Sequence, residues 1–297
     1  MLLPVTAFAQ DDARLKKRIA ELEAENRALR AIIVKIQSAM SEVPKSSVST
    51  AASGSDGLRI IVVPGDWGES QLTDIRKVCQ SAARGLVKNL PGDGFAPILV
   101  ERSTNGPITL YKRGTGNEFV VRLDTANRAW AQCAFQFSHE FCHIVCNYRS
   151  GSNSQKWFEE TICETASLFA LREMAKEWKT NPPYSNWKSY STSLAGYVDQ
   201  RLNKIKVTGS AAEVYERQAD HLSKNGTDRE LNLFLASKLL PLFEKKPAGW
   251  QSLRYLNLGP LKENDSFKVY LNAWHQRVPA KHKPFVVEIA KQFAIEW

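Results

Sequence analysis

The sequence predicts an α+β fold, in which a small mixed β-sheet packs on a mostly helical remainder. Short β-branched segments separated by turn residues occupy 58–124, and helical periodicity dominates from Asn127 onward. The chain has 297 residues, of which 43% are hydrophobic and 24% charged, as expected for a globular protein of one or two domains. This composition excludes collagen, disorder throughout the chain and a disulfide-stabilised miniprotein.

Residues 1–9 form an apolar segment that ends in Ala7-Phe8-Ala9, the small-x-small pattern of a signal-peptidase site. We therefore expect 1–9 to be the remnant of a signal peptide and the protein to be exported, periplasmic or extracellular. The basic front end of a signal peptide is missing, so either the start codon is assigned too far downstream or the apolar segment is fortuitous. The segment is too short for a membrane-spanning helix, and no transmembrane segment is predicted.

Residues 10–40 are predicted to form a parallel dimeric coiled coil, which makes the protein a homodimer through residues 12–40. Apolar positions alternate in steps of four and three, and Asn26 occupies an a position, where a polar pair specifies one register. The heptad positions are Leu15, Ile19, Leu22, Asn26, Leu29, Ile33, Ile36 and Met40. The pattern resembles that of leucine zippers. The alternative is an amphipathic helix lying on the protein's own body.

Residues 41–57 are rich in Ser, Ala and Gly and are expected to form a flexible linker. The globular domain is predicted over 58–297. Its first part, 58–178, holds the sheet and the active-site helices, with strands expected over 58–63, 96–101, 108–112 and 118–124 and a helix over 72–86. Its second part, 179–297, is expected to be helical. The aromatic side chains of this part are predicted to lie mainly in the core.

The net charge of +9 is spread along the chain, so a nucleic-acid partner is not predicted. The five cysteines are an odd number and match neither a zinc ribbon nor a disulfide scaffold, so we expect each to be a small buried residue. In an exported protein, Cys146 and Cys163 would be the first pair to test for a disulfide bridge between neighbouring helices.

Residues 139–143, His-Glu-Phe-Cys-His, have the spacing H-E-x-x-H. On an α-helix, His139 and His143 are one turn apart on the same face, so both imidazoles can reach one Zn²⁺ ion. Glu140 points about 100° away from His139 around the helix axis and can reach a water molecule bound to that ion. The apolar stripe of this helix lies roughly opposite the two histidines, so we expect them to point toward a cleft or a second layer.

Zinc catalysis needs a third protein ligand and an open fourth position. The helix predicted over 156–171 carries Glu159, Glu160 and Glu164, and it follows a polar loop over 147–156 that is compatible with a helix–loop–helix reversal. Glu160 and Glu164 share a helix face because they are four residues apart.

These two segments resemble the gluzincin metallopeptidases, the group of the thermolysin-like proteases and aminopeptidases. In that family H-E-x-x-H is followed, on the next helix, by a ligand Glu that Trp commonly precedes by three positions, and residues 157–160, Trp-Phe-Glu-Glu, fit this form. The resemblance covers 96–171. It implies His139, His143 and Glu160 as Zn²⁺ ligands, Glu140 as the catalytic base, and Glu164 as a carboxylate that orients one of the histidines.

Two assignments stay open within this resemblance. The ligand is assigned to Glu160, with Glu159 as the alternative, and a third possibility is that neither binds, because an acidic pair at a helix start also interacts favourably with the helix dipole. The family usually completes its oxyanion site with a Tyr or His from the downstream helical region, and His221 is the candidate, with Tyr215 next.

The family also places a strand at the sheet edge just before the first helix, where substrate backbone pairs, and 119–123 stands at the corresponding place. Thr161 follows the ligand where many members have Gly, and the metzincin pattern with a third His is not matched.

The resulting prediction is a zinc-dependent peptidase that hydrolyses peptide bonds by metal-activated water, with Glu140 as general base and a peptide or protein as substrate. One alternative is a catalytically inactive, metallopeptidase-like envelope scaffold or adaptor that acts through its coiled coil. Another is a purely structural zinc site that a fourth ligand such as Cys146 closes.

Overall fold

The computed structural model describes residues 18, 19, 21, 22, 24, 58–90, 94–260 and 263–297. The chain divides into two compact units, Met1–Ser53 and Gly54–Trp297. The described residues of the first unit are helical, with Arg18 Nη1 3.1 Å from Glu21 Oε2. The predictions for 1–9 and 41–57, and nearly all of the coiled coil over 10–40, lie outside the described residues.

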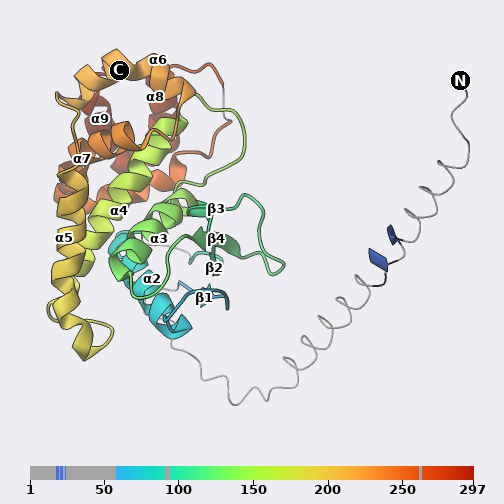
Figure 1. Cartoon of the computed structure of the whole chain (residues 1–297). Coiled ribbons are helices and arrows are strands. Elements are labelled where there is room, and N and C mark those ends of the chain that lie inside the picture. Colours follow the sequence, from blue (N-terminus) through green and yellow to red (C-terminus); the bar gives the residue numbers. More distant parts are fainter. Residues whose placement is uncertain (1–17, 20, 23, 25–57, 91–93, 261–262) are drawn as a thin grey trace, which may run out of the picture. The chain divides into compact units, whose positions relative to one another are not determined.

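The second unit is α+β, as predicted, with one small mixed sheet and a mainly helical remainder (Figure 1). The strands are β1 (Ile60–Val62), β2 (Ile98–Arg102), β3 (Ile108–Thr109) and β4 (Phe119–Leu123). Their order in the sheet is β1-β2-β4-β3. β1, β2 and β4 run parallel, and β3 is antiparallel to β4.

The prediction that 119–123 forms the edge of the sheet is wrong. Val121 of β4 pairs with Val100 of β2 on one side and with Thr109 of β3 on the other. The chain between β3 and β4 reverses in a turn, where the Gly114 N–H donates to the carbonyl of Glu118, so the short strand β3 takes the outer place. The edge strand next to the candidate site is therefore β3.

Two helices, α2 (Leu72–Val87) and α3 (Trp130–Val145), pack beside the sheet (Figure 1). α2 connects the parallel strands β1 and β2 and buries the apolar positions that its helical periodicity predicted, including Ile75, Val78 and Leu86. α3 contacts β3 and β4 and buries Phe137 and Phe141. This contact brings the H-E-x-x-H helix against the edge of the sheet.

The next helix, α4 (Lys156–Trp178), lies at the centre of the second unit. It contacts α2, α3, α5 (Ser191–Leu202) and α7 (Arg229–Lys245). Most of its side chains are buried on every side of the helix, as expected of a helix that other elements surround. Figure 1 shows α4 crossing between the sheet with α3 and the C-terminal helices.

The remaining helices complete the C-terminal part. They are α6 (Ala211–Lys224), α8 (Phe267–Arg277) and α9 (Lys283–Gln292), with the 3₁₀ helices η1 (Ser185–Tyr190), η2 (Pro247–Tyr255) and η3 (Ala280–His282). None of the described helices is long and apolar enough to cross a bilayer.

Aromatic side chains of the C-terminal part pack on the first turn of α4. The ring centroid of Phe267 lies 4.7 Å from that of Trp157 and 5.0 Å from that of Phe158. Phe293 and Tyr215 also contact these rings. The aromatic residues therefore belong to the core, as predicted, and they hold the turn of α4 that carries the acidic pair.

Candidate metal centre

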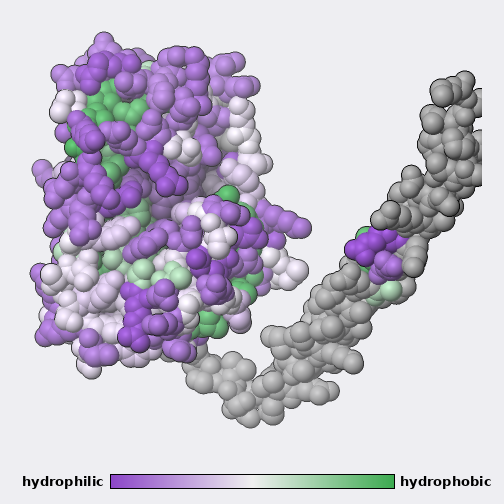
Figure 2. Space-filling model, in the orientation of Figure 1, coloured by the Kyte–Doolittle hydropathy of each residue, from purple (hydrophilic) through white to green (hydrophobic). Residues whose placement is uncertain are grey.

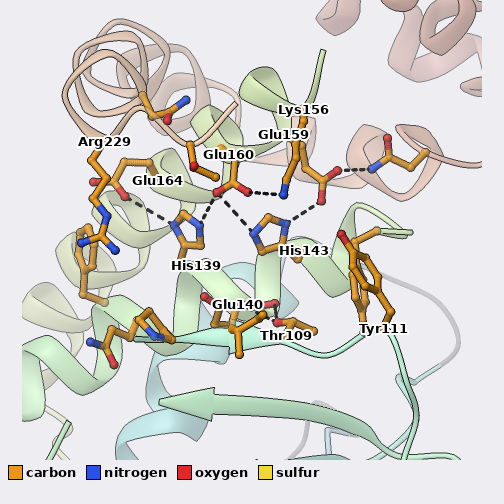
Figure 3. A pocket seen from close by; sticks show the side chains of 18 of the residues that line it. Thr109, Tyr111, His139, Glu140, His143, Lys156, Glu159, Glu160, Glu164 and Arg229 are labelled. Atoms are coloured by element: carbon orange, nitrogen blue, oxygen red, sulfur yellow. Dashed lines mark hydrogen bonds and ion pairs between the residues drawn. The ribbon is translucent and has the colours of Figure 1, made fainter. Parts of the chain in front are cut away.

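α3 and α4 bring the three predicted ligands together. Figure 3 shows His139 and His143 side by side, with Glu160 facing both rings. Glu160 Oε2 lies 3.2 Å from His139 Nε2 and 3.8 Å from His143 Nε2. All three side chains are largely shielded from solvent, with 13–19% of each exposed.

These distances fit a bound divalent ion. Nitrogen and oxygen ligands at about 2.0–2.1 Å from a tetrahedral ion are separated from one another by about 3.3 Å. The distances from the carboxylate oxygen to the two Nε2 atoms, 3.2 and 3.8 Å, lie on either side of this value. The donor set of two imidazoles and a carboxylate is one that zinc uses in proteins.

A second carboxylate contacts the Nδ1 atom of each histidine. His143 Nδ1 lies 2.6 Å from Glu159 Oε1, and His139 Nδ1 lies 3.5 Å from Glu164 Oε2. A proton on Nδ1 directed at a carboxylate leaves the lone pair of Nε2 free for a metal. This geometry fits Glu160 as a ligand better than Glu159, which contacts the opposite nitrogen of His143.

The downstream helical part holds these orienting carboxylates in turn. Asn257 donates its side-chain N–H to Glu159 Oε2 at 2.8 Å, and the hydroxyl of Tyr270 donates to Asn257 Oδ1 at 3.0 Å. On the other side, Arg201 Nη2 donates to Glu164 Oε1 at 2.7 Å. Because Asn257, Tyr270 and Glu159 are buried, each of these bonds satisfies a polar group that water cannot reach.

The charges of the site are strongly coupled. Burial acts to lower the pKa of His143, but the hydrogen bond and the charge of Glu159 outweigh it and raise this pKa to about 9. Burial acts to raise the pKa of Glu160, but the hydrogen bond from His139 and the charges of both histidines lower it to about 2. The ionised form of Glu160 is thus stabilised by the positive charge of the two histidines.

Glu140, the predicted base, is buried and lines the same cavity as the two histidines. The hydroxyl of Thr109, on the edge strand β3, lies 2.9 Å from Glu140 Oε2 and also 2.9 Å from its backbone carbonyl oxygen. The single proton of this hydroxyl can serve either acceptor. Thr109 therefore fixes the position of the carboxylate relative to the sheet edge.

The site opens into a cavity of about 570 Å³ between α3, α4 and β3. Its walls also include Tyr111, Tyr148, Lys156 and Arg229, and Figure 3 shows Lys156 beside Glu160 and Arg229 on the side of Glu164. The face of the second unit drawn in Figure 2 is mostly hydrophilic. This volume lies within the usual range of ligand-binding pockets.

The structure does not bring His221 to this cavity. His221 is exposed on α6, and its Nε2 lies 2.8 Å from Asp228 Oδ2, at the start of α7. Tyr215, the second candidate, stacks on Trp157 in the aromatic core instead. No residue of α6 lines the cavity, so the distance along the chain did not locate a residue of the site here.

The cysteines are buried, as predicted, and all five are free thiols. The sulfur atoms of Cys146 and Cys163, the pair singled out for a disulfide bridge, lie within 4.8 Å of each other and are not bonded.

Comparison of the chain with models of protein families, with curated proteins and with solved structures found no match. The likeness to gluzincins therefore consists of the two short motifs, and the function has to be inferred from the geometry of the site.

Proposed function

We propose that the protein is a zinc-dependent peptidase, in which His139, His143 and Glu160 hold the ion and Glu140 acts as general base. A single observation supports this proposal most directly. One carboxylate oxygen of Glu160 faces the Nε2 atoms of both histidines, at 3.2 and 3.8 Å, while another carboxylate engages the Nδ1 atom of each ring. Packing alone does not require five polar side chains to be oriented in this way.

The zinc ion, when bound, supplies a Lewis acid that lowers the pKa of water and polarises the scissile carbonyl. Glu140 accepts the proton of the attacking water and passes it to the leaving amine. Thr109 holds the Glu140 carboxylate on the side of the cavity that faces β3. A base that is already in position when the substrate arrives needs no rearrangement during the reaction.

Substrate backbone can be bound by β3, whose outer side has no partner strand among the described residues. An extended peptide adds to a sheet edge through main-chain hydrogen bonds, largely independent of its side chains. Ile108 of this strand lines the cavity, and its side chain is exposed. A peptide paired with β3 would pass close to Glu140, because Thr109 of the same strand touches that residue.

The alternative of a purely structural site receives less support. Cys146, the proposed fourth ligand of such a site, is fully buried and does not line the cavity. The export of the protein and its dimerisation through residues 12–40 stay predictions from the sequence.

The decisive experiment combines metal analysis with cleavage of a broad peptide library, for the wild type and Glu140→Gln. We expect one zinc per chain in both proteins, and cleavage by the wild type only, with a loss of about 10²-fold or more in the variant because the general base is removed. Glu216→Gln, a change of an exposed carboxylate on α6, is the matched control and should cleave normally. Undiminished cleavage by Glu140→Gln, or a wild type that binds no metal, would contradict the proposal.

A further inference from the structure

Three cysteine side chains meet between α3 and α4, next to the histidines. Cys142 lies in the last turn of α3, Cys146 is the C-cap residue of this helix four positions later, and Cys163 reaches them from α4. The sulfur atoms of Cys142 and Cys146 are 4.0 Å apart, and all three sulfur atoms lie within 4.8 Å of one another. The three side chains are completely buried, and all are free thiols.

We propose that this cluster is a second metal site, which binds one soft monovalent ion such as Cu(I) through three thiolates. Three sulfur atoms at about 2.3 Å from an ion in a trigonal plane lie about 4.0 Å from one another. The spacing between Cys142 and Cys146 has this value, and Cys163 Sγ lies within 4.8 Å of both, so an ion can bind with only a small adjustment between the two helices. Each thiol that ligates the ion releases its proton to solvent.

The two sites differ in the chemistry of their donor atoms. Thiolate sulfur is a soft ligand that selects Cu(I), whereas the imidazole nitrogens and the carboxylate of the first site suit a divalent ion such as zinc. The cluster also lies close to that first site, because Cys163 Sγ is within 4.8 Å of ring nitrogens of both histidines. Positive charge at the first site offsets the negative charge that a thiolate complex brings into the protein interior.

The remaining two cysteines provide a comparison within the same chain. Cys79 on α2 and Cys133 on α3 are also buried free thiols, and they are close enough to interact with each other. They form a pair and so lack the third sulfur of a trigonal site. Replacement of Cys133 therefore removes a buried thiol without touching the proposed ligands.

The test is an anaerobic titration of the full chain with Cu(I), in competition with a chromophoric Cu(I) chelator. We expect one ion per wild-type chain, with the ultraviolet charge-transfer band of a copper–thiolate bond. Cys163→Ala and Cys146→Ala should each weaken binding at least tenfold, whereas Cys133→Ala should bind as the wild type does. Glu160→Gln should also keep its Cu(I), because that residue belongs to the other site.

X-ray absorption at the copper edge is measured on the wild type, so this part of the test does not require any variant to fold. The wild type should show only sulfur neighbours, at about 2.3 Å. A wild type that binds no Cu(I), nitrogen neighbours around the copper, or full binding by folded Cys163→Ala would each overturn the proposal. The copper site does not depend on the proposed peptidase activity. Zinc content and peptide cleavage of Cys163→Ala are measured separately, so failure of one proposal can be told apart from failure of the other.

Discussion

Glu159 and Glu160 are adjacent in sequence and identical in chemistry, yet they contact opposite sides of the same histidine. Successive residues of a helix point about 100° apart. Glu160 therefore reaches the Nε2 side of His143, whereas Glu159 reaches its Nδ1 side. In the proposed site, one position along α4 separates the ligand, Glu160, from the orienting residue, Glu159.

Single substitutions of this pair should separate the two roles. We expect Glu160→Gln to abolish tight zinc binding, because it removes a charged ligand. Glu159→Gln should retain the ion with an affinity lowered by about 10–100-fold, the usual effect of removing a partner of a metal-ligating histidine. Competition with a zinc chelator measures both affinities. If Glu159→Gln lost the ion and Glu160→Gln kept it, the assignment would have to be exchanged.

Asn257 and Tyr270, from the C-terminal part, hold the carboxylate of Glu159 through hydrogen bonds. Asn257→Ala leaves Glu159 Oε2 without its buried donor, so we expect zinc affinity to fall by about tenfold and stability by about 1–3 kcal/mol. Tyr270→Phe removes only the hydroxyl that holds the Asn257 side chain, and its effect should be smaller. Chelator competition and thermal unfolding of the metal-free protein report the two effects. Equal zinc affinity in Asn257→Ala and wild type would show that Glu159 needs no such support.

At the scale of secondary structure elements, α3 and α4 could be predicted because both motifs have helical spacing. The sequence predicted a helix over 156–171, and α4 extends to Trp178. It also predicted that His139, His143 and Glu160 converge, because i and i+4 positions on paired helices can share one ion. The order of the strands could not be predicted in this way, since hydrogen bonding between β3 and β4 places β4 inside the sheet.

The partners of the site residues were equally inaccessible to sequence analysis. Asn257 lies 98 residues from Glu159, Arg201 lies 37 residues from Glu164, and Thr109 lies 31 residues from Glu140. No local spacing rule connects residues so far apart. Only the packing of α5, the turn after η2 and β3 around α3 and α4 creates these contacts.

The N-terminus of α7 is stabilised by the side chain of Asp228. Asp228 caps this helix by accepting hydrogen bonds from the N–H groups of Glu230 and Leu231, both at 3.1 Å, and it also holds His221. We expect Asp228→Ala to destabilise the protein by about 1 kcal/mol and to leave zinc binding unchanged. Urea unfolding of the metal-free protein measures the loss. Asp228→Asn, which retains the capping oxygen, is the control and should lose less.

The pH dependence of this cap follows from the direction of the pKa shift. Burial acts to raise the pKa of Asp228, but the hydrogen bonds from Leu231 and His221 outweigh it, so the pKa is lower than its ordinary value of 3.8. A lowered pKa means that the charged form stabilises the fold above that ordinary value. The contribution is lost as the pH falls through the lowered pKa. Wild type and Asp228→Ala should therefore converge in stability in strong acid.

At the scale of the whole molecule, residues 54–297 form a unit with its own core. A chain that begins at Leu58 should therefore fold and bind zinc. If residues 12–40 mediate dimerisation, this shorter chain should sediment as a monomer and the full chain as a dimer. The full chain with Asn26→Ile should form a mixture of oligomeric states, because the polar pair that specifies the register is lost. A dimer formed by the shorter chain would show that the globular unit carries the interface.

The first turn of α4 belongs both to the core and to the candidate metal centre. Trp157 and Phe158 are fully buried among aromatic rings, and the next two positions carry the carboxylates that face the histidines. Loosening of the C-terminal helices would move both pairs together. Unfolding of these helices should therefore also release a bound ion, whereas removal of the ion leaves the aromatic packing around Trp157 and Phe158 in place.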